Sequence, residues 1–115
     1  MAGRERVICA SAALLEGGGG VRFEVTRGGD LLPAFVVRFR GVAYAYLNEC
    51  MHEATELDWE HGDFFDEHKL YLICASHGAA YDPSTGICVA GPCKGARLAR
   101  VDVSEHNGAV FTGEA

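Results

Sequence analysis

Residues 74–82 read Cys-Ala-Ser-His-Gly-Ala-Ala-Tyr-Asp, and residues 50–52 read Cys-Met-His. These two stretches decide how the rest of the sequence is interpreted, because each brings a cysteine and a histidine close together in the chain. Both follow directly on an apolar segment that reads as a strand, so each Cys/His pair is expected in a loop at a strand end. Two loops that each present one thiolate and one imidazole can close around a metal centre.

Two kinds of metal centre accept two thiolates and two imidazoles. A tetrahedral zinc ion binds Cys₂His₂. A [2Fe–2S] cluster also accepts this set, with both thiolates on one iron and both imidazoles on the other. The spacing favours the cluster, because each loop here supplies one ligand of each type. A usual zinc finger instead places its cysteines together and its histidines together.

The bulk composition is that of one ordinary globular domain. The chain has 115 residues, of which 49% are hydrophobic and 23% charged, and we expect a single domain over residues 1–115. The net charge of −6 argues against nucleic acid or an anionic membrane as the main partner, because both attract basic surfaces. No apolar run approaches the roughly 18 residues of a membrane span, and no convincing signal peptide precedes the domain. These observations predict a cytoplasmic protein.

The remaining cysteines do not suggest a disulfide framework. The chain has five cysteines, and an odd number in a cytoplasmic protein favours metal binding over disulfides. Cys88 and Cys93 could form a short bridge, but we interpret them as small buried residues near the metal centre. Cys9 is interpreted as a strand or core residue.

Hydrophobic periodicity predicts an all-β domain. Apolar and polar residues alternate at 21–26, and again at 34–47 around Gly41, which indicates a strand followed by a hairpin. Shorter strands are expected at 70–73, 87–90 and 98–103. Asn107-Gly108 predicts a tight hairpin that returns through 109–111. The best stretch of helical periodicity is residues 10–16, and it is short.

Residues 53–67, which separate the two Cys/His pairs, carry seven acids and no lysine or arginine. Apolar residues interleave with the acids, so we expect the segment to fold back onto the domain; they are Leu57, Trp59, Phe64 and Phe65. The simplest interpretation is a solvated loop. The alternative is a docking surface for a basic partner, because complementary charge speeds the encounter of electron-transfer proteins.

The pattern Cys-X-His followed by Cys-X-X-His resembles the motif of the Rieske [2Fe–2S] domain family. The resemblance extends past the ligands, through Tyr81-Asp82, Thr85-Gly86 and Gly91-Pro92, and covers roughly residues 20–113. It is strongest to small stand-alone bacterial domains and to ferredoxin components of multicomponent oxygenases.

The resemblance implies both a fold and a ligand set. The expected fold is an antiparallel β-sandwich or barrel base with a small cluster-binding subdomain, whose cluster loops lie at about 48–55 and 74–93. One [2Fe–2S] cluster per chain would be bound by Cys50, His52, Cys74 and His77.

The resemblance also implies an electron carrier. In the family, a reductase passes single electrons to such a ferredoxin, which hands them to a terminal oxygenase or a similar oxidoreductase. Electrons would enter and leave through His52 and His77, and loops at Met51, Ser76 and Pro92 would frame the docking face. The sequence has no Gly-rich nucleotide fingerprint and no second iron site of the two-His-one-carboxylate kind, so we expect an electron-transfer component and not a catalytic subunit.

Two alternatives stay open at the level of sequence. The chain could be the small Rieske subunit of an oxidoreductase such as nitrite reductase. It could also be a zinc-stabilised binding module without a redox function.

The residues around the motif predict a low reduction potential. The family's high-potential respiratory members carry an extra disulfide, whose cysteines would fall near Thr55 and at Ser76, and a serine at the position of Ala79 that bonds a cluster sulfur. Such hydrogen bonds raise the potential, and the acids of 53–67 disfavour an added electron, although solvent screens much of this effect. Protein-film voltammetry should give a midpoint in the lower half of the Rieske range of roughly −150 to +300 mV. A midpoint in the upper half would contradict this prediction.

Overall fold

The computed structural model describes residues 6–48, 64–65, 70–74, 79–91 and 95–113. Within these residues the chain forms short strands and one 3₁₀ turn, and no helix there is long and apolar enough to cross a membrane. In chain order the elements are β1 (Arg6–Ala10), η1 (Ser11–Ala13), β2 (Val21–Arg27), β3 (Asp30–Phe39), β4 (Val42–Leu47), β5 (Leu72–Ile73), β6 (Ala80–Tyr81), β7 (Cys88–Ala90), β8 (Arg100–Val101), β9 (Val103–His106) and β10 (Ala109–Thr112).

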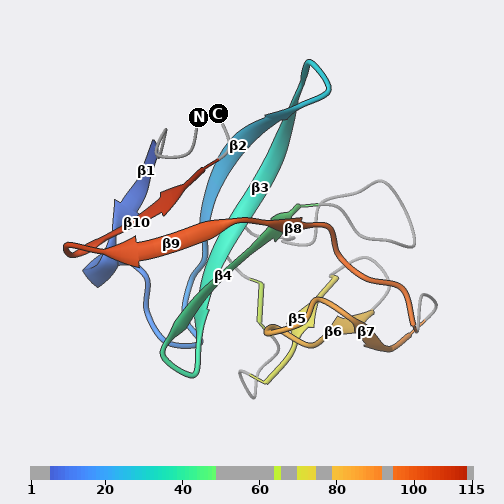
Figure 1. Cartoon of the computed structure of the whole chain (residues 1–115). Coiled ribbons are helices and arrows are strands. Elements are labelled where there is room, and N and C mark those ends of the chain that lie inside the picture. The colour runs from blue at the N-terminus through green and yellow to red at the C-terminus, as the bar shows by residue number, and fades with distance from the viewer. Residues whose placement is uncertain (1–5, 49–63, 66–69, 75–78, 92–94, 114–115) are drawn as a thin grey trace.

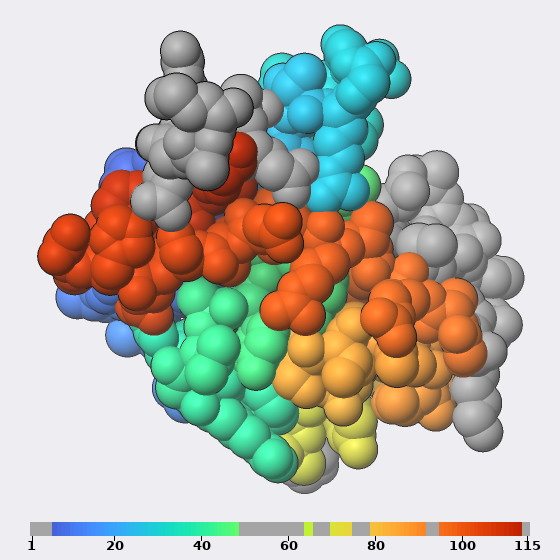
Figure 2. Space-filling view, viewed as in Figure 1, coloured from blue at the N-terminus to red at the C-terminus, as the bar shows by residue number. Residues whose placement is uncertain are grey.

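The strands form three antiparallel sheets (Figure 1). Two of them, β1-β10-β9 and β2-β3-β4-β8, make up the larger part of the molecule, which we call the base. The third, β5-β6-β7, lies at one end of the base and is called the small subdomain. Its surface, yellow to orange in Figure 2, meets the green surface of β4. The predicted all-β fold, an antiparallel base with a small subdomain, is confirmed.

The β3–β4 hairpin is buried on both faces because successive residues of a strand point to opposite sides. On one face, Phe35 and Val37 join Tyr46 in the core shared with the small subdomain. On the other face, Val36 and Ala45 join the core formed with β1, β2, β9 and β10. Two apolar cores therefore share one hairpin, and the position of the small subdomain is set by the same strands that organise the base.

Most predicted strands are present, and three features differ from the predictions. Strand β1 was not foreseen; it pairs with β10 across nearly the whole sequence. The stretch 10–16, the best helical candidate, contains only the 3₁₀ turn Ser11–Ala13. Strand β3 also begins earlier than expected, at Asp30, because Gly28 and Gly29 adopt positive φ angles of 57° and 85° and close the β2–β3 hairpin.

The predicted Asn107-Gly108 hairpin is confirmed, with φ angles of 52° and 76°, as a type I′ turn requires.

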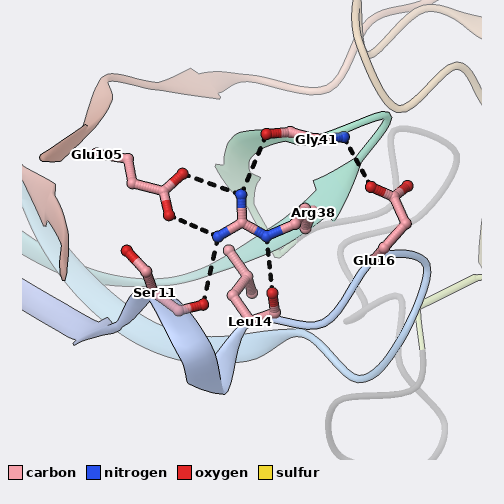
Figure 3. Close-up of polar contacts among 6 residues, drawn as sticks. All are labelled: Ser11, Leu14, Glu16, Arg38, Gly41 and Glu105. Carbon is pink, nitrogen blue, oxygen red and sulfur yellow. Dashed lines mark hydrogen bonds and ion pairs between the residues drawn. The ribbon is translucent and has the colours of Figure 1, made fainter. Parts of the chain in front are cut away.

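Arg38, on β3, connects three parts of the base (Figure 3). Its guanidinium donates to the backbone oxygens of Leu14 at 2.8 Å, Ser11 at 3.3 Å and Gly41 at 3.2 Å. It also donates to both carboxylate oxygens of Glu105 on β9, at 3.0 and 2.6 Å. The hydrogen bond from Arg38, followed by one from Ser11, lowers the pKa of Glu105 to about 2. The bonds from Arg38 to the backbone of residues 11–14 and to Glu105 fix η1 and β9 on the β3–β4 hairpin.

Gly91, just after β7, lies against Ala79, just before β6. A Cβ atom on Gly91 would come within 2.8 Å of the Ala79 Cα, and the φ angle of Gly91 is 101°. The Ala79 carbonyl accepts a hydrogen bond of 2.9 Å from the N–H of Cys74. Cys74 and Ala79 therefore form a hydrogen-bonded backbone pair, called the Cys74–Ala79 unit, at the end of the small subdomain. Gly91 packs closely against this unit.

This close approach predicts that Gly91→Ala destabilises the fold more than Gly95→Ala. Gly95 is a matched control, since its φ angle of 94° is similar but a Cβ there would meet nothing within 4 Å. Both variants acquire the backbone strain of about 1–2 kcal/mol, and only Gly91→Ala adds overpacking of about 1–3 kcal/mol. Urea unfolding followed by circular dichroism measures both losses. Equal losses in the two variants would contradict the predicted role of the contact.

Candidate metal centre

Of the four predicted cluster ligands, Cys74 falls within the described residues. It directly follows β5, and its side chain is fully buried. Its sulfur is not used in a disulfide. The prediction that the second Cys/His pair begins at a strand end is confirmed for Cys74. The other three predicted ligands, Cys50, His52 and His77, lie outside the described residues, as do Met51, Ser76 and Pro92.

The backbone on either side of positions 75–78 is held together. β5 pairs antiparallel with β6, with Leu72 opposite Tyr81 and Ile73 opposite Ala80. The hydrogen bond from Cys74 N–H to the Ala79 carbonyl extends this pairing by one step. The positions that carry the second Cys/His pair are therefore bounded by a closed hairpin whose strands are packed into the core.

The approach to the first Cys/His pair is also fixed. β4 ends at Leu47, and the next residue, Asn48, is buried and donates its N–H to the Pro33 carbonyl at 2.9 Å. Tyr46 of β4 belongs to the same apolar core as Cys74, Ala79 and Tyr81. The strands that lead to the two pairs thus share one core, which brings their ends to the same region of the molecule.

The segment between the pairs is anchored at its C-terminal end. Phe64 is fully buried and stacks on Phe35 with ring centroids 4.1 Å apart. Its carbonyl accepts the N–H of Ile73 at 2.8 Å, and Phe65 forms a bridge with Leu72. The expectation that the segment folds back onto the domain is confirmed for these two aromatic residues. Leu57, Trp59 and the seven acids lie outside the described residues.

The described surroundings of Cys74 suit a metal–thiolate centre. The thiolate is a soft ligand that iron–sulfur clusters require, and here it would lie in a water-poor core beside the buried Ala79 and Tyr81. Within the described ranges, no group of three or more metal-binding side chains comes together. The full ligand set therefore depends on the three residues outside those ranges, and its composition stays a prediction from the sequence.

Two further cysteines, Cys88 and Cys9, fall within the described residues. Cys88 is buried and forms no disulfide, and its thiol donates to the Ala90 carbonyl at 3.2 Å. This confirms the interpretation of Cys88 as a small buried residue, whereas Cys93 lies outside the described residues. Cys9 lies opposite Val110 in the β1–β10 pairing, which confirms it as a strand residue, and burial raises its pKa.

Comparison with solved structures identifies similar folds. A ferredoxin from Nocardioides aromaticivorans IC177, of carbazole 1,9a-dioxygenase, has a TM-score of 0.72 and 22% identity, and the match covers 96% of this chain and 98% of that one. The Sphingomonas yanoikuyae B1 ferredoxin has the same TM-score and identity, with 96% and 99% coverage. A chain from a complex of oxygenase and ferredoxin in carbazole 1,9a-dioxygenase has a TM-score of 0.71 and 26% identity, with 96% and 94% coverage.

Longer chains contain the same fold as a part. In another carbazole 1,9a-dioxygenase complex, the matched chain has a TM-score of 0.77 and 19% identity, and this protein covers 28% of its length. No curated protein matches the sequence.

The family comparison agrees with the geometry around Cys74. The model of the Rieske [2Fe-2S] domain matches residues 5–110, nearly the whole chain. The protein therefore belongs to the Rieske [2Fe–2S] domain family, and its cofactor is a [2Fe–2S] cluster.

Proposed function

We propose that the protein is a cytoplasmic electron carrier whose cluster is bound by Cys50, His52, Cys74 and His77. The observation that carries this proposal is the fully buried, disulfide-free thiol of Cys74 at the end of β5, in a chain whose family binds a [2Fe–2S] cluster. When bound, such a cluster accepts and releases one electron at a time. Each Cys/His pair would contribute one thiolate and one imidazole, so both loops would be needed for either iron.

The protein's own residues would hold and shield this centre. The hydrogen bond between Cys74 and Ala79 fixes the backbone from which the thiolate projects. Burial of Cys74, Ala79 and Tyr81 excludes water from that side of the site. A ligand held by a packed core stays in place when the charge of the centre changes, which is what repeated electron transfer requires.

The proposed partners are a reductase, which supplies the electrons, and a terminal oxygenase, which takes them. The support comes from the matched structures. Two matched ferredoxins are covered almost from end to end, over 98% and 99% of their chains. A third matched chain, at 26% identity, comes from a complex in which a ferredoxin accompanies an oxygenase.

The ligand assignment predicts that Cys74→Ser abolishes the cluster and Cys88→Ser preserves it. Wild-type protein should be brown, contain about two iron and two sulfide per chain, and take up one electron in a dithionite titration. Cys88→Ser is a matched control, because Cys88 is an equally buried cysteine and a serine hydroxyl can still donate to the Ala90 carbonyl. Iron and sulfide analysis of anaerobically reconstituted protein checks both variants.

Two results would contradict the proposal. One is a colourless wild-type protein that retains zinc after reconstitution, which would favour a zinc-stabilised module. The other is a Cys74→Ser protein whose iron and sulfide content equals that of the wild type.

A further inference from the structure

Tyr46 connects the base to the small subdomain through its hydroxyl. The side chain lies on β4 and is fully buried, and its O–H donates to the Pro83 carbonyl at 2.7 Å. Pro83 is itself buried, in the turn between β6 and β7. Burial raises the pKa of Tyr46 to about 12, so the hydroxyl keeps its proton and remains a donor at neutral pH.

The ring of Tyr46 packs against the same turn. A Cβ atom on Gly86 would lie 2.7 Å from the Tyr46 Cε1, and Gly86 has a φ angle of 78°. The N–H of Gly86 donates to the Asp82 carbonyl at 2.7 Å, and the Gly86 carbonyl accepts the N–H of Leu98 at 2.8 Å. The turn is therefore closed by its own hydrogen bond and is seated on β4 by both the hydroxyl and the ring of one side chain.

A short series of backbone contacts leads from this turn to Cys74. β7 continues from the turn to Gly91, which approaches the Ala79 Cα so closely that a Cβ there would lie 2.8 Å away. The Ala79 carbonyl in turn accepts the N–H of Cys74 at 2.9 Å. The small subdomain meets β4 (Figure 2). Its seating there thus affects how Gly91 lies against the Cys74–Ala79 unit.

We propose that Tyr46 is a positioning residue for the cluster: its hydroxyl holds the β6–β7 turn on the base and thereby keeps Gly91 packed beside the Cys74–Ala79 unit. The inference rests on the proposed function, because it takes Cys74 as a cluster ligand. Removing the hydroxyl leaves the buried Pro83 carbonyl without this donor, which disfavours the seated turn. The turn then separates from β4 more often, and solvent reaches the Cys74 side of the site more often.

The test compares Tyr46→Phe with Tyr44→Phe and the wild type. Tyr46→Phe removes the hydroxyl and keeps the ring that packs on Gly86. Tyr44 is a matched control on the same strand, partly buried and beneath the guanidinium of Arg100. Two rates are measured on the cluster-loaded protein: loss of the cluster's visible absorbance to an iron chelator, and hydrogen–deuterium exchange by mass spectrometry.

We expect Tyr46→Phe to lose its cluster about fivefold faster than the wild type, the factor that corresponds to one hydrogen bond of ~1 kcal/mol. Amide exchange should quicken in the peptide 79–91 and stay unchanged in the peptide 103–112, which contains β9 and β10. Tyr44→Phe should match the wild type in both rates. This regional difference is a readout that general loss of packing does not produce.

Several outcomes would overturn the inference. Wild-type rates in Tyr46→Phe would show that the hydroxyl does not hold the turn. Faster exchange in both peptides would show a general structural role. If the wild type binds no [2Fe–2S] cluster, the proposed function fails and this inference fails with it, whereas a loaded wild type with an unaffected Tyr46→Phe removes this inference alone.

Discussion

Phe35 and Tyr46 lie opposite each other in the β3–β4 pairing, with their ring centroids 6.0 Å apart. Both rings are fully buried on the face of the hairpin that meets the small subdomain. The neighbouring residues in register, Val36 and Ala45, are buried on the opposite face, in the core of the base. One hairpin therefore contributes to both cores, and its strands position the small subdomain on the base.

This arrangement suits a protein that has to hold a metal centre at one end of a β base. The backbone at Cys74 is fixed by the β5–β6 pairing and by the bond to Ala79. Phe64 extends the same core by stacking on Phe35. A ligand supported in this way moves little, and a buried thiolate is shielded from solvent. Within the base, the Arg38–Glu105 ion pair joins β3 to β9.

Local patterns in the sequence predicted the local parts of this structure well. The alternation of residues 34–47, the Asn107-Gly108 turn and the strand end at Cys74 were all read from neighbouring residues, and the structure confirms them. The pairing of β1 with β10 joins the two ends of the sequence, and no local pattern reports a contact of that kind. The contacts of Arg38 were not predicted either, because its guanidinium binds Glu105 and two backbone carbonyls from residues 11–14, which are remote from it in the sequence.

The bond from Tyr46 to Pro83 could not be read from the sequence either. A buried tyrosine hydroxyl usually finds a hydrogen-bond partner, but the sequence does not indicate which residue, 37 positions away, supplies it. The ligand set was predicted from the sequence motif. The family match supports a [2Fe–2S] cluster, and the structure describes Cys74 among the four proposed ligands.

The most direct test of that ligand set is pulsed EPR of the dithionite-reduced wild-type protein, which detects the nuclei bonded to the cluster iron. Ligation by His52 and His77 predicts strong hyperfine coupling to two imidazole nitrogens. A paramagnetic cluster without directly bonded nitrogen, as four cysteine ligands would give, would contradict the assignment.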